Sequence, residues 1–94
     1  NLKNLHIVNN IFKIGDNIIK LKNRDICIKI DAEGHEHEVL QGLKNLLNYN
    51  KIFLQIEIFD KNFNKINKYL KKKKFKFLDS IYNDGKTDYY YKNF

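Results

Sequence analysis

Apolar and polar residues follow the two-residue period of a strand in some segments and the 3.6-residue period of a helix in others. The clearest strand is 25–31, which places three isoleucines on one face (Ile26, Ile28, Ile30) and a mixed set on the other (Cys27, Lys29, Asp31). Residues 52–58 form a nearly continuous apolar run, typical of a strand covered on both faces. A weaker strand is predicted over 5–14, interrupted by two asparagines, and a short helix over 16–21.

Two longer helices are predicted from helical spacing. The first carries one buried stripe after the 25–31 strand (Val39, Leu40, Leu43, Leu46, Leu47). Gly42 lies near that stripe, and we expect it to allow a close approach of helix to sheet. The second helix is expected to use Asp60 as its N-cap and to bury a second stripe (Phe63, Ile66, Tyr69, Leu70). It ends in lysines 71–74, where positive charge is favoured by the helix dipole.

The chain ends in two predicted strands, 75–82 and 87–92. The residues between them, Asn83-Asp84-Gly85-Lys86, have hairpin-turn chemistry. Two strand–helix–strand crossovers precede this hairpin and imply parallel pairing. The pattern therefore predicts an α/β fold with a mostly parallel sheet and a final antiparallel strand. Strand 25–31 is expected to lack its usual neighbour on one edge.

Composition limits the chain to one domain or part of one. It has 94 residues and no methionine, so we expect a fragment that does not begin at a natural start codon. One cysteine, Cys27, fits a reducing compartment and reads as a buried strand thiol. No signal peptide or run of 18 apolar residues is present, and we expect a cytoplasmic location.

The net charge of +7 is carried almost wholly by lysine, with Arg24 the sole arginine. Readers of bases and phosphates commonly use the bidentate guanidinium, which is nearly missing here. The enriched residues also share A/T-rich codons. We therefore interpret the charge as solvated surface and expect no nucleic-acid partner, although the aromatic residues of the last strands lie among lysines.

The most informative stretch is Ile28-Lys29-Ile30-Asp31-Ala32-Glu33-Gly34-His35-Glu36, followed by Val39-Leu40 and Gly42. It places two carboxylates at the carboxyl end of a predicted parallel strand, where open α/β sheets bind their ligands. Its fifteen positions resemble the signature of the FkbM-like S-adenosylmethionine-dependent methyltransferases. The resemblance implies that residues 1–94 are a partial methyltransferase domain, the C-terminal half of a Rossmann-like class I sheet.

The resemblance also implies roles for residues of this stretch. Asp31 and Glu33 are the candidate catalytic residues, and Asp31, Gly34 and His35 the candidate cofactor-binding residues. Asp31 could hold the donor's ammonium group, orient an acceptor hydroxyl or act as a general base, which requires a pKa raised toward neutrality. The structural alternatives are a helix-entry aspartate for Asp31 and a solvent-exposed loop acid or helix cap for Glu33.

Other residues near this stretch are given structural roles. Lys29 is unusual in so apolar a strand, and we expect it to pair with Glu57 or Asp31; Glu57 could instead face the acceptor. His35 and His37 are two residues apart, so a helix would point them about 200° apart and they could not share a metal ion. We expect His37 at the surface and no bound metal.

The leading hypothesis is a fragment of an enzyme that transfers a methyl group from S-adenosylmethionine to a hydroxyl of a sugar or secondary metabolite. The chain has no G-x-G motif, so we expect it to be inert without the N-terminal half that would supply the donor-binding loop. Two alternatives stay open. One is a non-enzymatic anion-binding module or truncated paralogue that uses its lysines, and the other is a metal protein that uses Asp31, Glu33 and His35.

Overall fold

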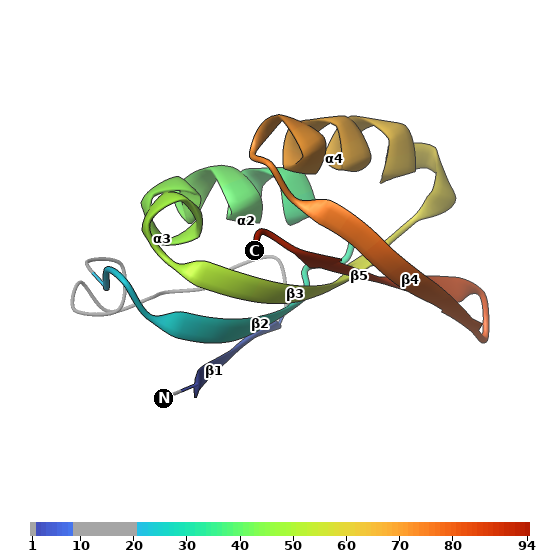
Figure 1. The fold of residues 1–94 in the computed structure, drawn as a ribbon. Helices are drawn as coiled ribbons and strands as arrows, with labels where there is room; N and C mark the ends of the chain where they lie inside the picture. The colour runs from blue at the N-terminus through green and yellow to red at the C-terminus, as the bar shows by residue number, and fades with distance from the viewer. Residues whose placement is uncertain (1, 9–20) are drawn as a thin grey trace.

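The computed structural model describes residues 2–8, where only the backbone is placed, and residues 21–94. Its elements are β1 (Leu2–Val8), β2 (Asp25–Asp31), α2 (Glu36–Gly42), α3 (Lys44–Tyr49), β3 (Lys51–Ile58), α4 (Asp60–Lys72), β4 (Lys76–Asn83) and β5 (Lys86–Lys92). The strands form one sheet in the order β1-β2-β3-β5-β4 (Figure 1). Residues 16–20 of the helix predicted over 16–21 and residues 9–14 of the strand predicted over 5–14 fall outside the described residues, and Leu21 is not helical.

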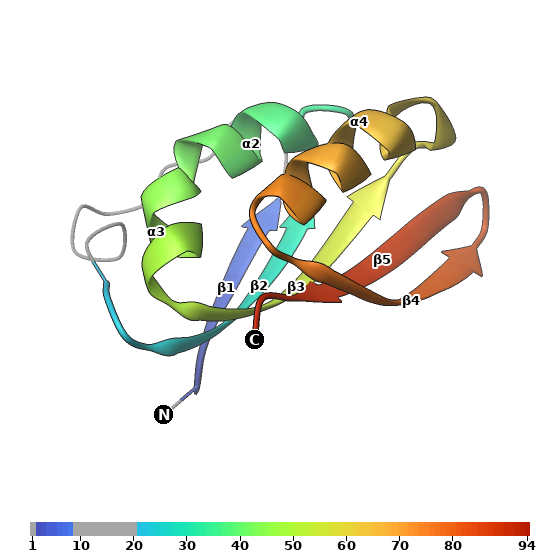
Figure 2. The same ribbon diagram turned by 45° about the horizontal axis from the view of Figure 1, so that its top comes forward.

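The sheet is mixed, and the prediction of a mostly parallel sheet is wrong. β1 pairs with β2 and β2 with β3 in parallel, whereas β5 pairs antiparallel with both β3 and β4. Figure 2 shows β1, β2 and β3 running in one direction. The terminal hairpin therefore contributes as many pairings as the crossovers do. The prediction of an open edge beside β2 is also wrong, because β1 occupies that edge.

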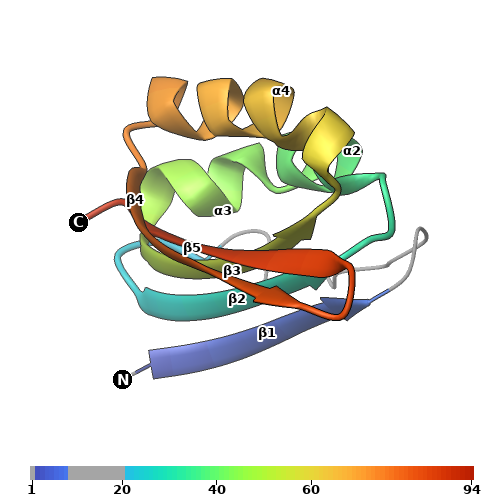
Figure 3. The same ribbon diagram turned by 90° about the vertical axis from the view of Figure 1, so that its right-hand side faces the viewer.

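The hydrophobic core lies between the sheet and its helices. α2, α3 and α4 all lie on one face of the sheet (Figure 3). The isoleucines of β2, the alternate apolar residues of β3 and the leucine stripe of α2 and α3 are buried together, as predicted. On β3 the opposite face, with Phe53, Gln55 and Glu57, stays partly exposed. The prediction that this strand is covered on both faces is therefore only partly met among the described residues.

The first predicted helix is two helices. α2 ends at Gly42 and α3 begins at Lys44, with Leu43 between them donating to the carbonyls of both Val39 and Leu40. The stripe still buries all five predicted residues. Gly42 itself is exposed, so its predicted close approach to the sheet is wrong. It ends α2 at the break between the two helices.

α4 begins one residue earlier than predicted. Phe59 is its N-cap, and Asp60 is the first helical residue. At the other end, the Phe75 amide donates to the Leu70 carbonyl at 2.9 Å and the Lys74 amide donates to the Lys71 carbonyl at 2.9 Å. These two bonds are a Schellman cap. Its left-handed position, normally glycine, holds Lys74 with φ of 67°.

The hairpin between β4 and β5 is confirmed. Its two central residues, Asp84 and Gly85, have φ of 53° and 82°, as a type I′ turn requires. A bulge at Phe77/Asp79 shifts the register of β4 against β5. The half-buried Cys27 lies on the face of β2 away from the helices, and its thiol is free.

Candidate functional site

The candidate site forms where the parallel strands β2 and β3 end beside one another. The register pairs Ile30 with Ile56, so the next residues along the strands, Asp31 and Glu57, leave the sheet at the same edge. Glu57 is also opposite Asp88 of β5. Three carboxyl groups thus lie in a row across three neighbouring strands, and we call Asp31, Glu57 and Asp88 the acid row.

The carboxyl groups of the acid row lie close enough for Asp31 and Asp88 to affect the pKa of Glu57. Burial, first, and then a hydrogen bond with the Asp31 carboxyl and its charge raise the pKa of Glu57. Lys86 opposes this effect, since its Nζ lies 3.7 Å from Glu57 Oε1, while Asp88 adds to it. The strand ends therefore hold two neighbouring carboxyl groups, and the presence of Asp31 raises the pKa of Glu57.

The predicted pairing of Lys29 with Glu57 or Asp31 is wrong. The sheet register pairs Lys29 with Gln55, two residues before Glu57, and the Lys29 side chain is exposed. Glu57 forms its ion pair with Lys86 instead. Sequence reasoning gave Glu57 chiefly a structural role, although its place two residues beyond the partner of Lys29 puts it beside Asp31. Only the strand register reveals this position, and no local pattern in the sequence gives that register.

The loop after β2 is a tight turn built on two residues with positive φ. Glu33 has φ of 47° and Gly34 of 97°, and the His35 amide closes the turn on the Ala32 carbonyl at 3.1 Å. A methyl group built on Gly34 would meet only the Phe59 ring, at 3.6 Å. The glycine is thus required for its backbone conformation and not for space. Glu33 and His35 are exposed on this loop, where a ligand could reach them.

Glu36 is the functional residue that sequence reasoning undervalued. It is buried, with 1% of its surface exposed, in the first turn of α2. Its Oε2 accepts a hydrogen bond from the Gly34 amide at 2.9 Å, which ties the loop to the helix. Among the described residues, its Oε1 is buried and has no hydrogen-bond partner. The family-like motif fixes an acid at this position, which was the available signal.

The environment of Glu36 favours its neutral form. Burial is the largest effect and raises the pKa of Glu36, and the negative charge of Asp31 raises it further. The Gly34 amide, the amide of Glu36 itself and His35 act in the opposite direction. The Asp31 carboxyl group therefore raises the pKa of both Glu36 and Glu57.

His37 is not the simple surface residue that the sequence predicts. It is half-buried and packs edge-on against Tyr69 with ring centroids 5.2 Å apart, joining α2 to α4. Within residues 2–8 and 21–94, no three His, Cys, Asp or Glu side chains are grouped to hold a metal ion. The metal-protein alternative therefore gains no support. No helix described is long and apolar enough to cross a membrane.

The fold and the site define an α/β protein with two acidic residues at the carboxyl ends of adjacent parallel strands, where proteins of this class bind ligands. The family model of the methyltransferase FkbM domain matches residues 7–77. This chain therefore belongs to the FkbM methyltransferase domain family. Searches of curated proteins and of solved structures give no match.

Proposed function

We propose that this chain is the C-terminal half of an S-adenosylmethionine-dependent O-methyltransferase domain. One observation carries the proposal beyond the family match. The carboxyl groups of Asp31 and Glu57 meet at the carboxyl ends of two adjacent parallel strands, which is where open α/β sheets bind ligands. The loop that follows β2 holds the other candidate residues next to this pair.

The residues of the site fit the donor chemically. S-adenosylmethionine is a sulfonium cation that also presents an ammonium group and ribose hydroxyls, all of which suit acceptors of hydrogen bonds and negative charge. The site offers carboxyl oxygens on Asp31 and Glu57, and Glu36 Oε1 is buried without a partner among the described residues. Asp31, Gly34 and His35 are the residues that would hold the donor. When bound, it supplies a methyl group activated for attack by an oxygen nucleophile.

The chain's own residues would position the acceptor and move its proton. Asp31 orients the acceptor hydroxyl, and Glu33 borders the entrance from the exposed side of the turn. Glu57 is a second candidate for the general base, because its raised pKa brings it closer to the range in which a base works efficiently. In-line methyl transfer depends mainly on holding the two reactants in position. A rigid loop tied by Glu36 serves that purpose.

The acceptor we propose is a hydroxyl of a sugar or a secondary metabolite. The proposed partner is the N-terminal half of the domain, which would contribute the glycine-rich donor loop. The chain alone is then inert, because it contains no G-x-G motif. A cytoplasmic location suits an enzyme that draws on the cell's pool of S-adenosylmethionine.

An NMR titration of the 94-residue chain with S-adenosylmethionine tests the site. We expect weak binding, with amide shifts confined to residues 31–36 and to the end of β3. Asp31→Asn should abolish these shifts, whereas the matched control Glu38→Gln, at an exposed residue of α2, should leave them unchanged. Shifts that survive in Asp31→Asn, or that map elsewhere, would contradict the proposal. The coding sequence upstream of Asn1 tests the partner: it should encode a strand, a glycine-rich loop and a later strand-end acid.

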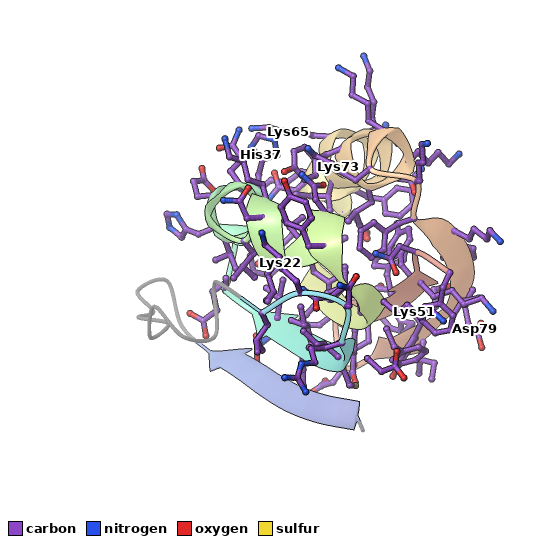
Figure 4. All side chains as sticks on the ribbon, turned by 60° about the vertical axis from the view of Figure 1, so that its left-hand side comes forward. Lys22, His37, Lys51, Lys65, Lys73 and Asp79 are labelled. Atoms are coloured by element: carbon purple, nitrogen blue, oxygen red, sulfur yellow. The ribbon has the colours of Figure 1, made fainter. Side chains whose placement is uncertain are left out.

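A second candidate function, anion binding by a non-enzymatic module, is favoured by one feature. Lys72, Lys73 and Lys74 line a cavity of about 450 Å³ together with Asn48 and Asn93. Elsewhere the lysines are spread over several parts of the chain, as Lys22, Lys51 and Lys65 show in Figure 4. This candidate predicts binding of single-stranded nucleic acid that weakens steeply with salt and is indifferent to Asp31→Ala. The methyltransferase proposal predicts instead that substitution of Asp31 abolishes the binding of S-adenosylmethionine.

A further inference from the structure

The outer strand of the sheet presents an unusual amount of apolar surface. β4 is the edge strand in the order β1-β2-β3-β5-β4, with no strand on its outer side among the described residues. Its residues 76–82 are all exposed. Four of them are large and apolar, with exposed fractions of 41–71% (Phe77, Leu78, Ile81, Tyr82). An open edge of this kind is a template for pairing with another strand, and proteins usually protect it with charge or proline.

The order of residues along β4 is complementary to itself. The strand reads Lys76-Phe77-Leu78-Asp79-Ser80-Ile81-Tyr82-Asn83, which is polar, two apolar, two polar, two apolar, polar. The bulge places Leu78 and Asp79 at one position of the strand. If two copies pair antiparallel about Ser80, Leu78 therefore faces Ile81 and Phe77 faces Tyr82. Each apolar pair then occurs twice, as the two-fold symmetry of an isologous contact demands. A slip of one residue would place apolar against polar side chains.

The bulge in β4 makes both apolar pairs possible on matching faces. Leu78 and Ile81 are three residues apart, so in a regular strand they would point to opposite faces. The bulge at Phe77/Asp79 adds one residue, and both side chains line the same apolar cavity on the face away from the helices, with Phe53 and Tyr90. Phe77 contacts the rings of Tyr89 and Tyr91 on the helix side. Facing residues in an antiparallel pair share a face, so this arrangement is consistent.

The charges of the strand suit the same pairing. Lys76 and Asp79 cancel within β4, although the whole chain carries +7. In the proposed register Lys76 lies next to Asp84 in the turn of the other copy. Both residues are exposed, and the contact occurs twice. Figure 4 shows Asp79 on the outer side of the molecule, away from Lys65 of α4.

We propose that the β4 edge is a homodimer interface. Two copies pair antiparallel through residues 76–83, so that their five-stranded sheets join into one continuous sheet across a two-fold axis. The contact is limited to one strand from each copy, and small interfaces of this kind are weak. We therefore expect a dissociation constant on the order of 10–100 μM. This inference does not depend on the proposed methyltransferase activity, since the acid row lies on the other strands of the sheet.

Sedimentation velocity across a concentration series, from about 1 μM to about 1 mM, tests this proposal. The wild-type chain should change from monomer to dimer within that range. Ile81→Lys should weaken dimerisation roughly tenfold or more, because an edge lysine opposes pairing and the change acts twice by symmetry. The control is Tyr49→Lys, an equally exposed residue on α3, which should leave the dimer unchanged. Far-UV circular dichroism of each variant checks that the fold is retained.

A cross-linking variant tests the register. Leu78→Cys with Ile81→Cys, in a Cys27→Ser background, should form a covalent dimer on oxidation, since facing residues in antiparallel strands lie at disulfide distance. Leu78→Cys with Tyr82→Cys should cross-link poorly, because these two side chains lie on opposite faces of the strand. A wild-type chain that stays monomeric throughout, or a dimer weakened equally by Ile81→Lys and Tyr49→Lys, would overturn the proposal. So would equal cross-linking of the two cysteine pairs.

Discussion

Replacing Glu36 by glutamine is the most informative perturbation of the candidate site. Glu36 is buried, donates no hydrogen bond when ionised, and ties the loop to α2 through the Gly34 amide. Glutamine has nearly the same shape and keeps an oxygen for that amide, but it carries no charge at any pH. The substitution therefore isolates the cost of the buried charge from the loss of the loop contact.

The expected effect has a definite sign. The folded-state pKa of Glu36 lies above its ordinary value of 4.5, because burial and Asp31 disfavour the ionised form. The folded chain thus holds this proton more tightly than the unfolded chain does. The resulting stability is complete below pH 4.5 and is lost as the pH rises through the folded-state pKa. Each pKa unit of the rise corresponds to about 1.4 kcal/mol lost above that range.

Urea unfolding of both proteins at a series of pH values measures this effect. The difference in unfolding free energy between Glu36→Gln and wild type should shift in favour of the variant as the pH rises from 4 to 8, by about 1.4 kcal/mol per unit of pKa rise. Packing of the glutamine amide adds the same amount to this difference at every pH, so it does not affect the change with pH. For Glu38→Gln, at an exposed acid two residues away, the plot of unfolding free energy against pH should run nearly parallel to that of the wild type. If the plot for Glu36→Gln also runs parallel to that of the wild type, burial does not raise the pKa of Glu36 and the prediction is refuted.

Two further predictions concern stability. Lys74→Gly should stabilise the chain by about 0.5–1 kcal/mol, because glycine relieves the left-handed conformation at the Schellman cap, and thermal unfolding should show a rise of a few degrees. Lys73→Gly, at a residue with φ of −86°, should give no such gain, and a gain of equal size there would contradict the explanation. Asn50→Ala should cost about 2–3 kcal/mol, because Asn50 accepts from the Arg24 amide and donates to the carbonyls of Leu21 and Leu46. A loss below about 1 kcal/mol in urea unfolding would argue that water replaces these bonds.

The sequence alone determined the local elements. The two-residue period of 25–31 and the leucine stripe of 39–47 predicted a strand and a helical face that the structure confirms. The Asp84-Gly85 turn predicted the hairpin, because few residues adopt positive φ in succession. The motif around Asp31 also led to the family, which the domain match confirms. These features depend on residues close together in the chain, so their signal is present in the sequence.

Only the tertiary structure decided which distant residues meet. Sequence reasoning paired Lys29 with Glu57, but the strand register places Gln55 beside Lys29 and Glu57 next to Asp31. The sequence shows Glu36 only as the last acid of the motif, whereas packing buries its carboxyl group and raises its pKa. A shift of one or two residues between strands leaves every local pattern unchanged. The register is set by packing of the whole sheet against its helices, and with it the chemistry of the acid row.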